Sequence, residues 1–305
     1  MKSNTRKAEM GSFKSIIYIA VLFLAGGCTK EIAGQTKSDT VGSAGDTTEI
    51  VNLYIFAGQS NCGRPQFPGK GLTGPAATAE QLAIYDSAIT GFQIYNPIYD
   101  SLAFHNLQVG VNTMLINYNS TTEMGAEVSL LKALKDSTNL KEAYLIKCGY
   151  GNTNLAEWWL DTGKWNLYRY TDKAIRILEK QNKIPVLKGF IWMQGENDAT
   201  DSIWAVNYQT NLQAFFSQFD AFYTGEASTL GLAAPDYIKV IGRINGSQDR
   251  SEIYRDIVRT NEEAFCAATA NSFLINTDNY PLFGGVHYTI TGQIQFGLDI
   301  YQALK

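Results

Sequence analysis

Histidine is scarce in this chain, because His105 and His287 are the only two among 305 residues. The four cysteines are scattered, and no CxxC pair occurs. Zinc sites usually take several His or Cys ligands at short spacings, and thiol redox motifs need paired cysteines. The sequence therefore argues against a metal centre, a redox motif and a disulfide framework, and we expect neither a metal nor a cofactor.

Clusters of basic residues are also lacking beyond the extreme N-terminus. Lys and Arg total 25 against 29 Asp and Glu, which gives a formal net charge of −4. Proteins that bind nucleic acid usually carry a basic patch or stripe. We therefore expect no nucleic-acid partner.

Long apolar runs are missing as well. The run at residues 16–24 has nine residues, whereas a membrane-spanning helix needs about 20. Basic residues precede this run and small residues follow it, which is typical of a secretory signal. The stretch Ala25-Gly26-Gly27-Cys28 resembles a bacterial lipobox, although Ala25 stands where Leu is usual.

The lipobox resemblance implies cleavage before Cys28 and lipidation of its thiol. The alternative is a plain signal peptide with an incidental cysteine. We expect residues 1–28 to be a lipoprotein signal, so that the protein touches a membrane only through an N-terminal lipid anchor. Its location would then be the bacterial cell envelope, on the periplasmic or the surface face of the outer membrane.

The rest of the chain divides into a short tether and one large domain. Residues 29–48 are mostly Gly, Ser, Thr, Lys and Asp, a composition that cannot bury enough apolar surface to fold. The remaining residues, 49–305, are numerous enough for one domain with a sizeable core. The whole chain is 45% hydrophobic and 18% charged, as in ordinary globular proteins.

Short apolar runs without clean polar alternation are typical of strands buried on both faces of a parallel sheet. The runs are Ile50–Ala57, Ala143–Cys148, Val186–Met193, Tyr237–Ile244 and Ser272–Thr277. Stretches with helical periodicity lie between them, and one more closes the chain. This alternation predicts a three-layer α/β/α, doubly wound fold with a mainly parallel, five-stranded sheet. The segment Gly63–Thr122, rich in Gly, Pro, Asn and Tyr, is interpreted as a long irregular insertion.

Candidate catalytic residues follow the strands, because ligands of such sheets bind beyond the carboxyl ends of the strands. Ser60 follows the first strand in Gly58-Gln59-Ser60-Asn61, where a serine can be an exposed nucleophile. A serine there can equally cap a helix. With two histidines available, the base must be His287 or His105. We favour His287, which stands at the mouth of the final helix, whereas His105 lies in the insertion without a motif.

Taken together and in this order, five sequence blocks resemble the sialate O-acetylesterase-like branch of the SGNH hydrolases, which includes the acetylxylan esterases of carbohydrate esterase family six. The blocks are Gly58–Asn61, Gly125–Val128, Gly151–Leu155, Gln194–Asp198 and Gly284–Gln293. The resemblance covers roughly Ile50 to Leu304. It implies a flavodoxin-like SGNH fold and a carbohydrate O-acetylesterase that acts on acetylated oligo- or polysaccharides.

By this resemblance Ser60 attacks the acetyl carbonyl and His287 takes its proton. The oxyanion would lie among the Ser60 N–H, a backbone N–H near Gly151 and the side chain of Gln194. The family's acid, three residues before the histidine, is replaced here by Gly284. We therefore expect either a dyad or Glu196 as the acid. In the block Gly151–Leu155, the family usually has a second glycine where this chain has Asn152. This substitution changes the pocket or the oxyanion hole.

Two other readings remain open. The aromatic cluster Tyr150, Trp158, Trp159 and Trp165 suits a catalytically weakened, glycan-binding lipoprotein, unless these residues are simply core. We assign substrate contacts to Asn152, Tyr150 and Trp158. The third reading is a lipase- or thioesterase-like hydrolase of the same fold, since fold alone does not fix the substrate.

Overall fold

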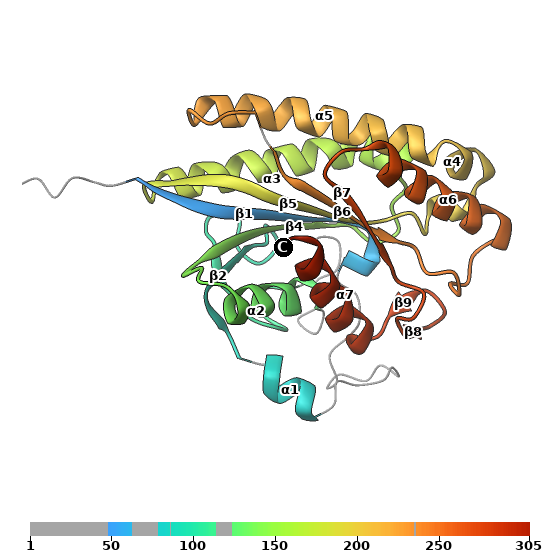
Figure 1. Ribbon diagram of the computed structural model, residues 1–305, viewed down its shortest axis with the longest axis horizontal. Helices are drawn as coiled ribbons and strands as arrows, with labels where there is room; N and C mark the ends of the chain where they lie inside the picture. Colours follow the sequence, from blue (N-terminus) through green and yellow to red (C-terminus); the bar gives the residue numbers. More distant parts are fainter. Residues whose placement is uncertain (1–47, 63–78, 86, 114–123, 235) are drawn as a thin grey trace, which may run out of the picture. The chain divides into compact units, whose positions relative to one another are not determined.

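A seven-stranded sheet with helices on both faces makes up the computed structural model (Figure 1). The structure describes residues 48–62, 79–85, 87–113, 124–234 and 236–305. These belong to one compact unit, Gly45–Lys305. The predicted signal, the lipidation site Cys28 and all but the last residue of the tether lie outside the described residues.

The sheet has the strand order β3-β2-β4-β1-β5-β6-β7. Its strands are β1 (Glu49–Gly58), β2 (Ile89–Tyr95), β3 (His105–Leu107), β4 (Ala143–Gly149), β5 (Lys183–Met193), β6 (Ile238–Arg243) and β7 (Ser272–Asn276). Strand β3 pairs antiparallel with β2, and all other neighbours pair parallel. The doubly wound α/β fold class is thereby confirmed.

The predicted count of five strands is wrong, because the supposed irregular insertion supplies two more strands, β2 and β3. In β2 Gly91, which has a φ of +84°, and the exposed Thr90 separate the buried Ile89 from Phe92, and Gln93 separates Phe92 from the buried Ile94 and Tyr95. So short and broken a run gives little periodicity, and its pairing with β4 decides its conformation. The insertion also contains α1 (Ala79–Tyr85), while residues 63–78, 86 and 114–123 lie outside the described residues.

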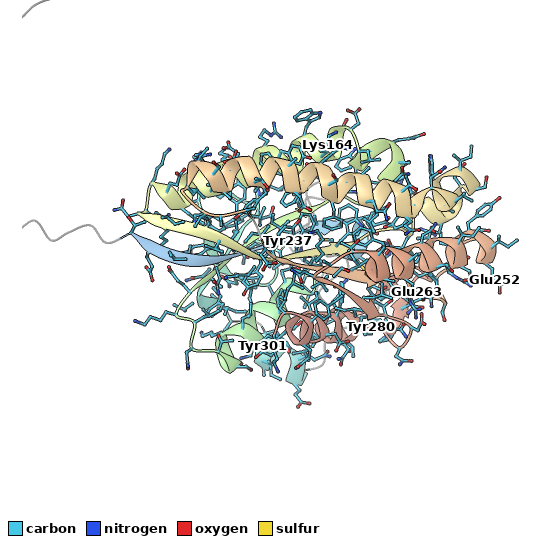
Figure 2. All side chains as sticks on the ribbon, turned by 45° about the horizontal axis from the view of Figure 1, so that its top comes forward. Lys164, Tyr237, Glu252, Glu263, Tyr280 and Tyr301 are labelled. Carbon is cyan, nitrogen blue, oxygen red and sulfur yellow. The ribbon has the colours of Figure 1, made fainter. Side chains whose placement is uncertain are left out.

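The helices cover the two faces of the sheet. They are α2 (Glu127–Ser137), α3 (Thr162–Glu179), α4 (Ser202–Val206), α5 (Tyr208–Thr229), α6 (Glu252–Ala268) and α7 (Ile290–Ala303). Helices α3 and α5 lie on one face, where α6 packs beside α5, and α2 and α7 lie on the other (Figure 1). In Figure 2, Lys164 of α3 and Tyr301 of α7 accordingly lie on opposite sides of the sheet. Within the described part of the chain, no helix combines the length and the apolar character needed to cross a membrane.

Strand β1 is central, since it lies between β4 and β5. Its residues from Leu53 to Ala57 are fully or almost fully buried, as expected of a strand covered on both faces. Because β1, β4, β5 and β6 run parallel, their carboxyl ends meet at one edge of the sheet. The loops that follow these four strands therefore come together there.

Candidate active site

A cavity of about 290 Å³ opens at this edge of the sheet. It is lined by Gln59, Ser60, Asn152, Arg250, Gly284, Val286 and His287. These residues come from the loops after β1, β4 and β6 and from the hairpin of β8 (Leu282–Phe283) and β9 (His287–Tyr288). Three of the predicted site residues, Ser60, Asn152 and His287, thus share one cavity.

Ser60 begins the short 3-10 helix η1 (Ser60–Cys62) directly after β1. The chain turns there beside the end of β5. Gly58 makes this possible: its φ is +141°, and a Cβ at this position would lie 2.0 Å from the carbonyl oxygen of Met193. The turn places the Ser60 Oγ 3.1 Å from Nε2 of His287. A serine hydroxyl within hydrogen-bond reach of an imidazole is the arrangement that general-base activation of a nucleophile requires.

His287 is held in the β8–β9 hairpin, where it pairs with Phe283. Gly284 and Gly285 make the turn of this hairpin with φ values of +60° and +73°, a region that favours glycine. The other histidine, His105, lies on the edge strand β3. Its Nε2 is 2.7 Å from Oδ2 of Asp100, and its ring packs edge-on against Tyr99.

Glu196 is fully buried and does not line the cavity. Its Oε1 accepts hydrogen bonds from Nδ2 of Asn61 at 2.5 Å and from Nε2 of Gln248 at 3.5 Å. Burial raises the pKa of this carboxyl group, and the Asn61 hydrogen bond opposes that shift. No hydrogen bond to Glu196 Oε2 occurs among the described residues. The described contacts therefore connect Glu196 to side-chain amides, and its role as the acid stays a prediction.

Asp278 lies before His287 in the segment that connects β7 to the final helix, and its carboxylate is bound by two arginines. It accepts hydrogen bonds from Arg259 at 2.7 and 2.9 Å and from Arg243 at 2.7 Å. The Arg259 hydrogen bonds lower its pKa to about 2. Asp278 thus fixes the end of β7 to α6 and remains ionised throughout the physiological range.

Gln194, predicted as an oxyanion donor, points into the protein. Its Nε2 lies 2.5 Å from Asp198 Oδ2, 3.0 Å from the carbonyl oxygen of Thr153 and 3.2 Å from Gln59 Oε1. An amide group has two N–H hydrogens, and the three acceptors around this one leave none for a ligand. Gln194 is fully buried and does not line the cavity. These contacts do not support the predicted role and make Gln194 a brace between strand ends.

Asp198 completes this brace. Its carboxylate accepts hydrogen bonds from the Leu155 N–H and from Gln194. Burial raises the pKa of Asp198 to about 7, although these hydrogen bonds lower it. The loop after β4, which contains Gly151 and Asn152, is thereby tied to the end of β5. Asn152 adopts a φ of +59° and is exposed at the cavity, in line with its predicted place in the pocket.

The aromatic cluster is mostly core. Tyr150 is 9% exposed, and its ring centroid lies 4.4 Å from that of Trp158. Trp159 is fully buried against Trp192. Neither Tyr150 nor Trp158 lines the cavity. Trp165 lies apart on α3 beside Tyr168 and is 63% exposed. The structure therefore does not bring Tyr150 and Trp158 to the site as substrate contacts.

Arg250 is a site residue that sequence reasoning missed. Its Nε donates to the carbonyl oxygen of Glu196 at 2.8 Å, and its Nη1 donates to the carbonyl oxygen of Asp249 at 2.7 Å. These two hydrogen bonds fix the guanidinium at the cavity wall. No motif surrounds Arg250 in the sequence, and only the path of the loop after β6 brings it beside Ser60 and His287. Among the described residues, no group of three or more His, Cys, Asp or Glu is placed to hold a metal ion.

The three-layer α/β fold thus brings a serine and a histidine within hydrogen-bond distance in a cavity at the carboxyl edge of the sheet. Residues 50–305 match the family described as "Carbohydrate esterase, sialic acid-specific acetylesterase". The chain belongs to this family, and its class of activity is ester hydrolysis.

Solved structures share the fold. A protein from Arabidopsis thaliana is similar with a TM-score of 0.64 and 17% identity, over 83% of this chain and 97% of that one. NanS is similar with a TM-score of 0.53 and 14% identity, over 84% of this chain and 98% of that one. No curated protein matches the chain significantly.

Proposed function

We propose that this protein removes acetyl groups from carbohydrates, with Ser60 as the nucleophile and His287 as the general base. The observation that carries the proposal is the 3.1 Å contact between Ser60 Oγ and His287 Nε2 in the cavity. Family membership supports ester hydrolysis on a carbohydrate. The proposal goes beyond family membership in two respects: it names the acetyl group as the acyl group removed, and it assigns the roles of Ser60 and His287.

In the proposed reaction, Ser60 Oγ bonds to the acetyl carbonyl carbon as His287 Nε2 takes the hydroxyl proton. The bond from the acetyl carbon to the sugar oxygen then breaks, and His287 hands the proton to that oxygen. Water repeats the sequence on the acetyl-serine and releases acetate. The Ser60 N–H and a backbone N–H near Gly151 are the proposed donors to the oxyanion.

The lining of the cavity favours an acetylated sugar that carries a carboxylate, as sialic acid does, over neutral acetylxylan. Arg250 contributes a permanent positive charge to the wall that also holds Ser60 and His287. Its two described hydrogen bonds use two of the five guanidinium N–H donors. A guanidinium held in this way can pair with a substrate carboxylate without losing much side-chain freedom.

The first test is acetate release from a panel of O-acetylated sialosides, xylans and mannans, together with acetyl, butyryl and octanoyl esters of one alcohol. We expect acetate release and a steep loss of rate with acyl length, because the cavity lining is mostly polar, with Val286 as its one aliphatic side chain, and gives a longer acyl chain little apolar surface to bury. A preference for the octanoyl ester would support the lipase-like alternative. Binding of glycans without hydrolysis of any ester would support the weakened, glycan-binding alternative.

The second test concerns Arg250. We expect Arg250→Gln to raise KM for an acetylated sugar acid by ~10-fold or more, since hydrogen bonds to charged groups contribute ~1.5–3 kcal/mol. KM for a matched neutral acetyl sugar should stay within ~2-fold, because that sugar has no carboxylate to pair with the guanidinium group. Lys180→Gln, at the C-terminal end of α3, is the control that removes an equal charge at the opposite edge of the sheet. Equal losses on both sugars would contradict the assignment of Arg250.

We also propose, from the sequence alone, that lipidated Cys28 anchors the protein in the bacterial cell envelope. The nine-residue apolar run before it is too short to span a bilayer. Because Cys28 lies outside the described residues, the anchor stays a prediction.

A further inference from the structure

Asn61, the residue after the proposed nucleophile, holds the main chain on both sides of His287. Its Nδ2 donates to the carbonyl oxygen of Val286 at 3.0 Å, and its Oδ1 accepts from the N–H of Tyr288 at 3.0 Å. The peptide groups before and after His287 are thus bound by one side chain. That side chain belongs to the same short helix η1 as Ser60. A displacement of the histidine relative to the serine would therefore break these hydrogen bonds.

Gln248, in the loop between β6 and α6, makes a second attachment to the same carbonyl group. Its Nε2 donates to the Val286 oxygen at 2.7 Å. The next residue adds a third, because the Asp249 N–H donates to the carbonyl oxygen of Gly285 at 2.7 Å. The glycine turn before His287 has backbone freedom of its own, and these contacts remove much of that freedom.

Glu196 determines how the two amides are oriented. Its Oε1 accepts hydrogen bonds from the NH2 ends of both Asn61 and Gln248, and this leaves the Asn61 oxygen for the N–H of Tyr288. Asn61 and Glu196 are fully buried and Gln248 is 1% exposed, so water does not compete for these groups. Each amide therefore bridges the carboxylate and the Val286 carbonyl group.

We propose that Asn61 and Gln248 form an amide clamp, oriented by Glu196, that keeps His287 in register with Ser60. The inference rests on the proposed function, and it makes all three residues positioning residues for that reaction. Glu196 then acts on His287 through the clamp, and it does not need to touch the imidazole. Misplacing a reacting group by about 1 Å can lower a rate by ~10²-fold, which sets the scale of the expected effects.

The test is Gln248→Met, which keeps the length of the side chain and removes both hydrogen bonds. We expect kcat on a small acetyl ester to fall by ~10-fold and KM to stay within ~2-fold, because positioning of the base acts on the chemical step. A fluorophosphonate probe reports activation of Ser60 without any acetyl group. Its second-order rate of reaction should fall in the same proportion as kcat.

Tyr223→Phe is the matched structural control. It removes the hydroxyl of Tyr223 on α5, which accepts a hydrogen bond from the Leu187 N–H at 3.0 Å and donates to the carbonyl oxygen of Pro185 at 3.4 Å, outside the cavity that holds Ser60. We expect this variant to lower Tm without changing kcat or the probe rate. If Gln248 only supports the fold, Gln248→Met will behave in the same way, and the clamp proposal is then wrong.

Glu196→Gln completes the design, alone and combined with Gln248→Met. If Glu196 works through the amides, its single effect should be ~10-fold, and the double variant should be hardly slower than the slower single variant. If Glu196→Gln lowers kcat by ~10⁴-fold, the scale for loss of a triad acid, and Gln248→Met leaves kcat unchanged, then Glu196 is the acid and the clamp proposal is wrong. A wild-type protein that reacts with the probe yet releases no acetate would refute the proposed function only, since the probe still tests the clamp.

Discussion

Ser60→Ala should leave a folded protein that releases no measurable acetate from any substrate in the panel. The substitution removes the oxygen that bonds to the acetyl carbon and keeps the backbone N–H at the same place. In a serine hydrolase, loss of the nucleophile costs ~10⁶ in kcat. The substitution removes one hydroxyl group and its contact with His287, and because a single hydrogen bond contributes about 1 kcal/mol, we expect only a small change in Tm.

The measurement is kcat/KM for a chromogenic acetyl ester, alongside Tm and labelling by the fluorophosphonate probe. Labelling should disappear together with activity, because the probe reacts with the same oxygen. A second buried serine, Ser129 of α2, serves as the control, since its Oγ donates to the carbonyl oxygens of Ala126 and Ile294 and does not line the cavity. In the Ser129→Ala variant, Ser60 should still be labelled by the probe. Retention of more than a few per cent of activity in Ser60→Ala would show that another group attacks the ester.

The pair proposed as catalytic, Ser60 and His287, could be predicted from the sequence for two physical reasons. Parallel strands bring their carboxyl ends to one edge, so a serine directly after β1 had to lie near the loops after β4 and β5. The scarcity of histidine then left two candidates for the base. The structure brings Ser60 and His287 within 3.1 Å of each other, whereas His105, expected in an irregular insertion, lies on the edge strand β3. Their catalytic roles stay predictions until variants are measured.

The residues around this pair were harder to predict from the sequence, because their roles depend on the direction in which each side chain points. Gln194 follows an apolar strand, as an oxyanion donor would, yet Asp198, only four residues later, draws its amide inward. Tyr150 and Trp158 suit a sugar platform by composition, but they pack against each other beside Trp159. Residue type and strand position do not fix such orientations. Partners from other loops fix them.

Arg250 and Gln248 are site residues that could not be predicted from the sequence. Both lie in the loop after β6, where neither periodicity nor a motif marks them. Their contacts join that loop to Glu196 and Val286, which are 38 to 54 residues away along the chain. Strands β2 and β3 were missed for a related reason, since the pairing of β2 with β4 and of β3 with β2 decides their conformation despite the weak local pattern of the insertion. Contacts of this kind become visible only in three dimensions.

His287→Ala should be nearly as damaging as Ser60→Ala, and His105→Ala should be mild. Without the imidazole, the Ser60 hydroxyl keeps its proton and is a weak nucleophile. In a related type of hydrolase, loss of the base alone costs about as much as loss of the whole triad. Because the base must be neutral to accept a proton, wild-type activity should also decline toward acid pH.

His105→Ala is the matched control, since it deletes the only other imidazole of the chain. The side chains of His105 and Asp100 are 40% and 31% exposed, and exposed ion pairs contribute about 1 kcal/mol or less. We therefore expect His105→Ala to lower Tm slightly and to keep kcat/KM within ~2-fold of wild type. Both variants should be compared at one pH, with folded protein quantified by circular dichroism. If His105→Ala is the inactive variant and His287→Ala keeps its activity, the base has been assigned to the wrong histidine, and the Ser60–His287 contact would then be only structural.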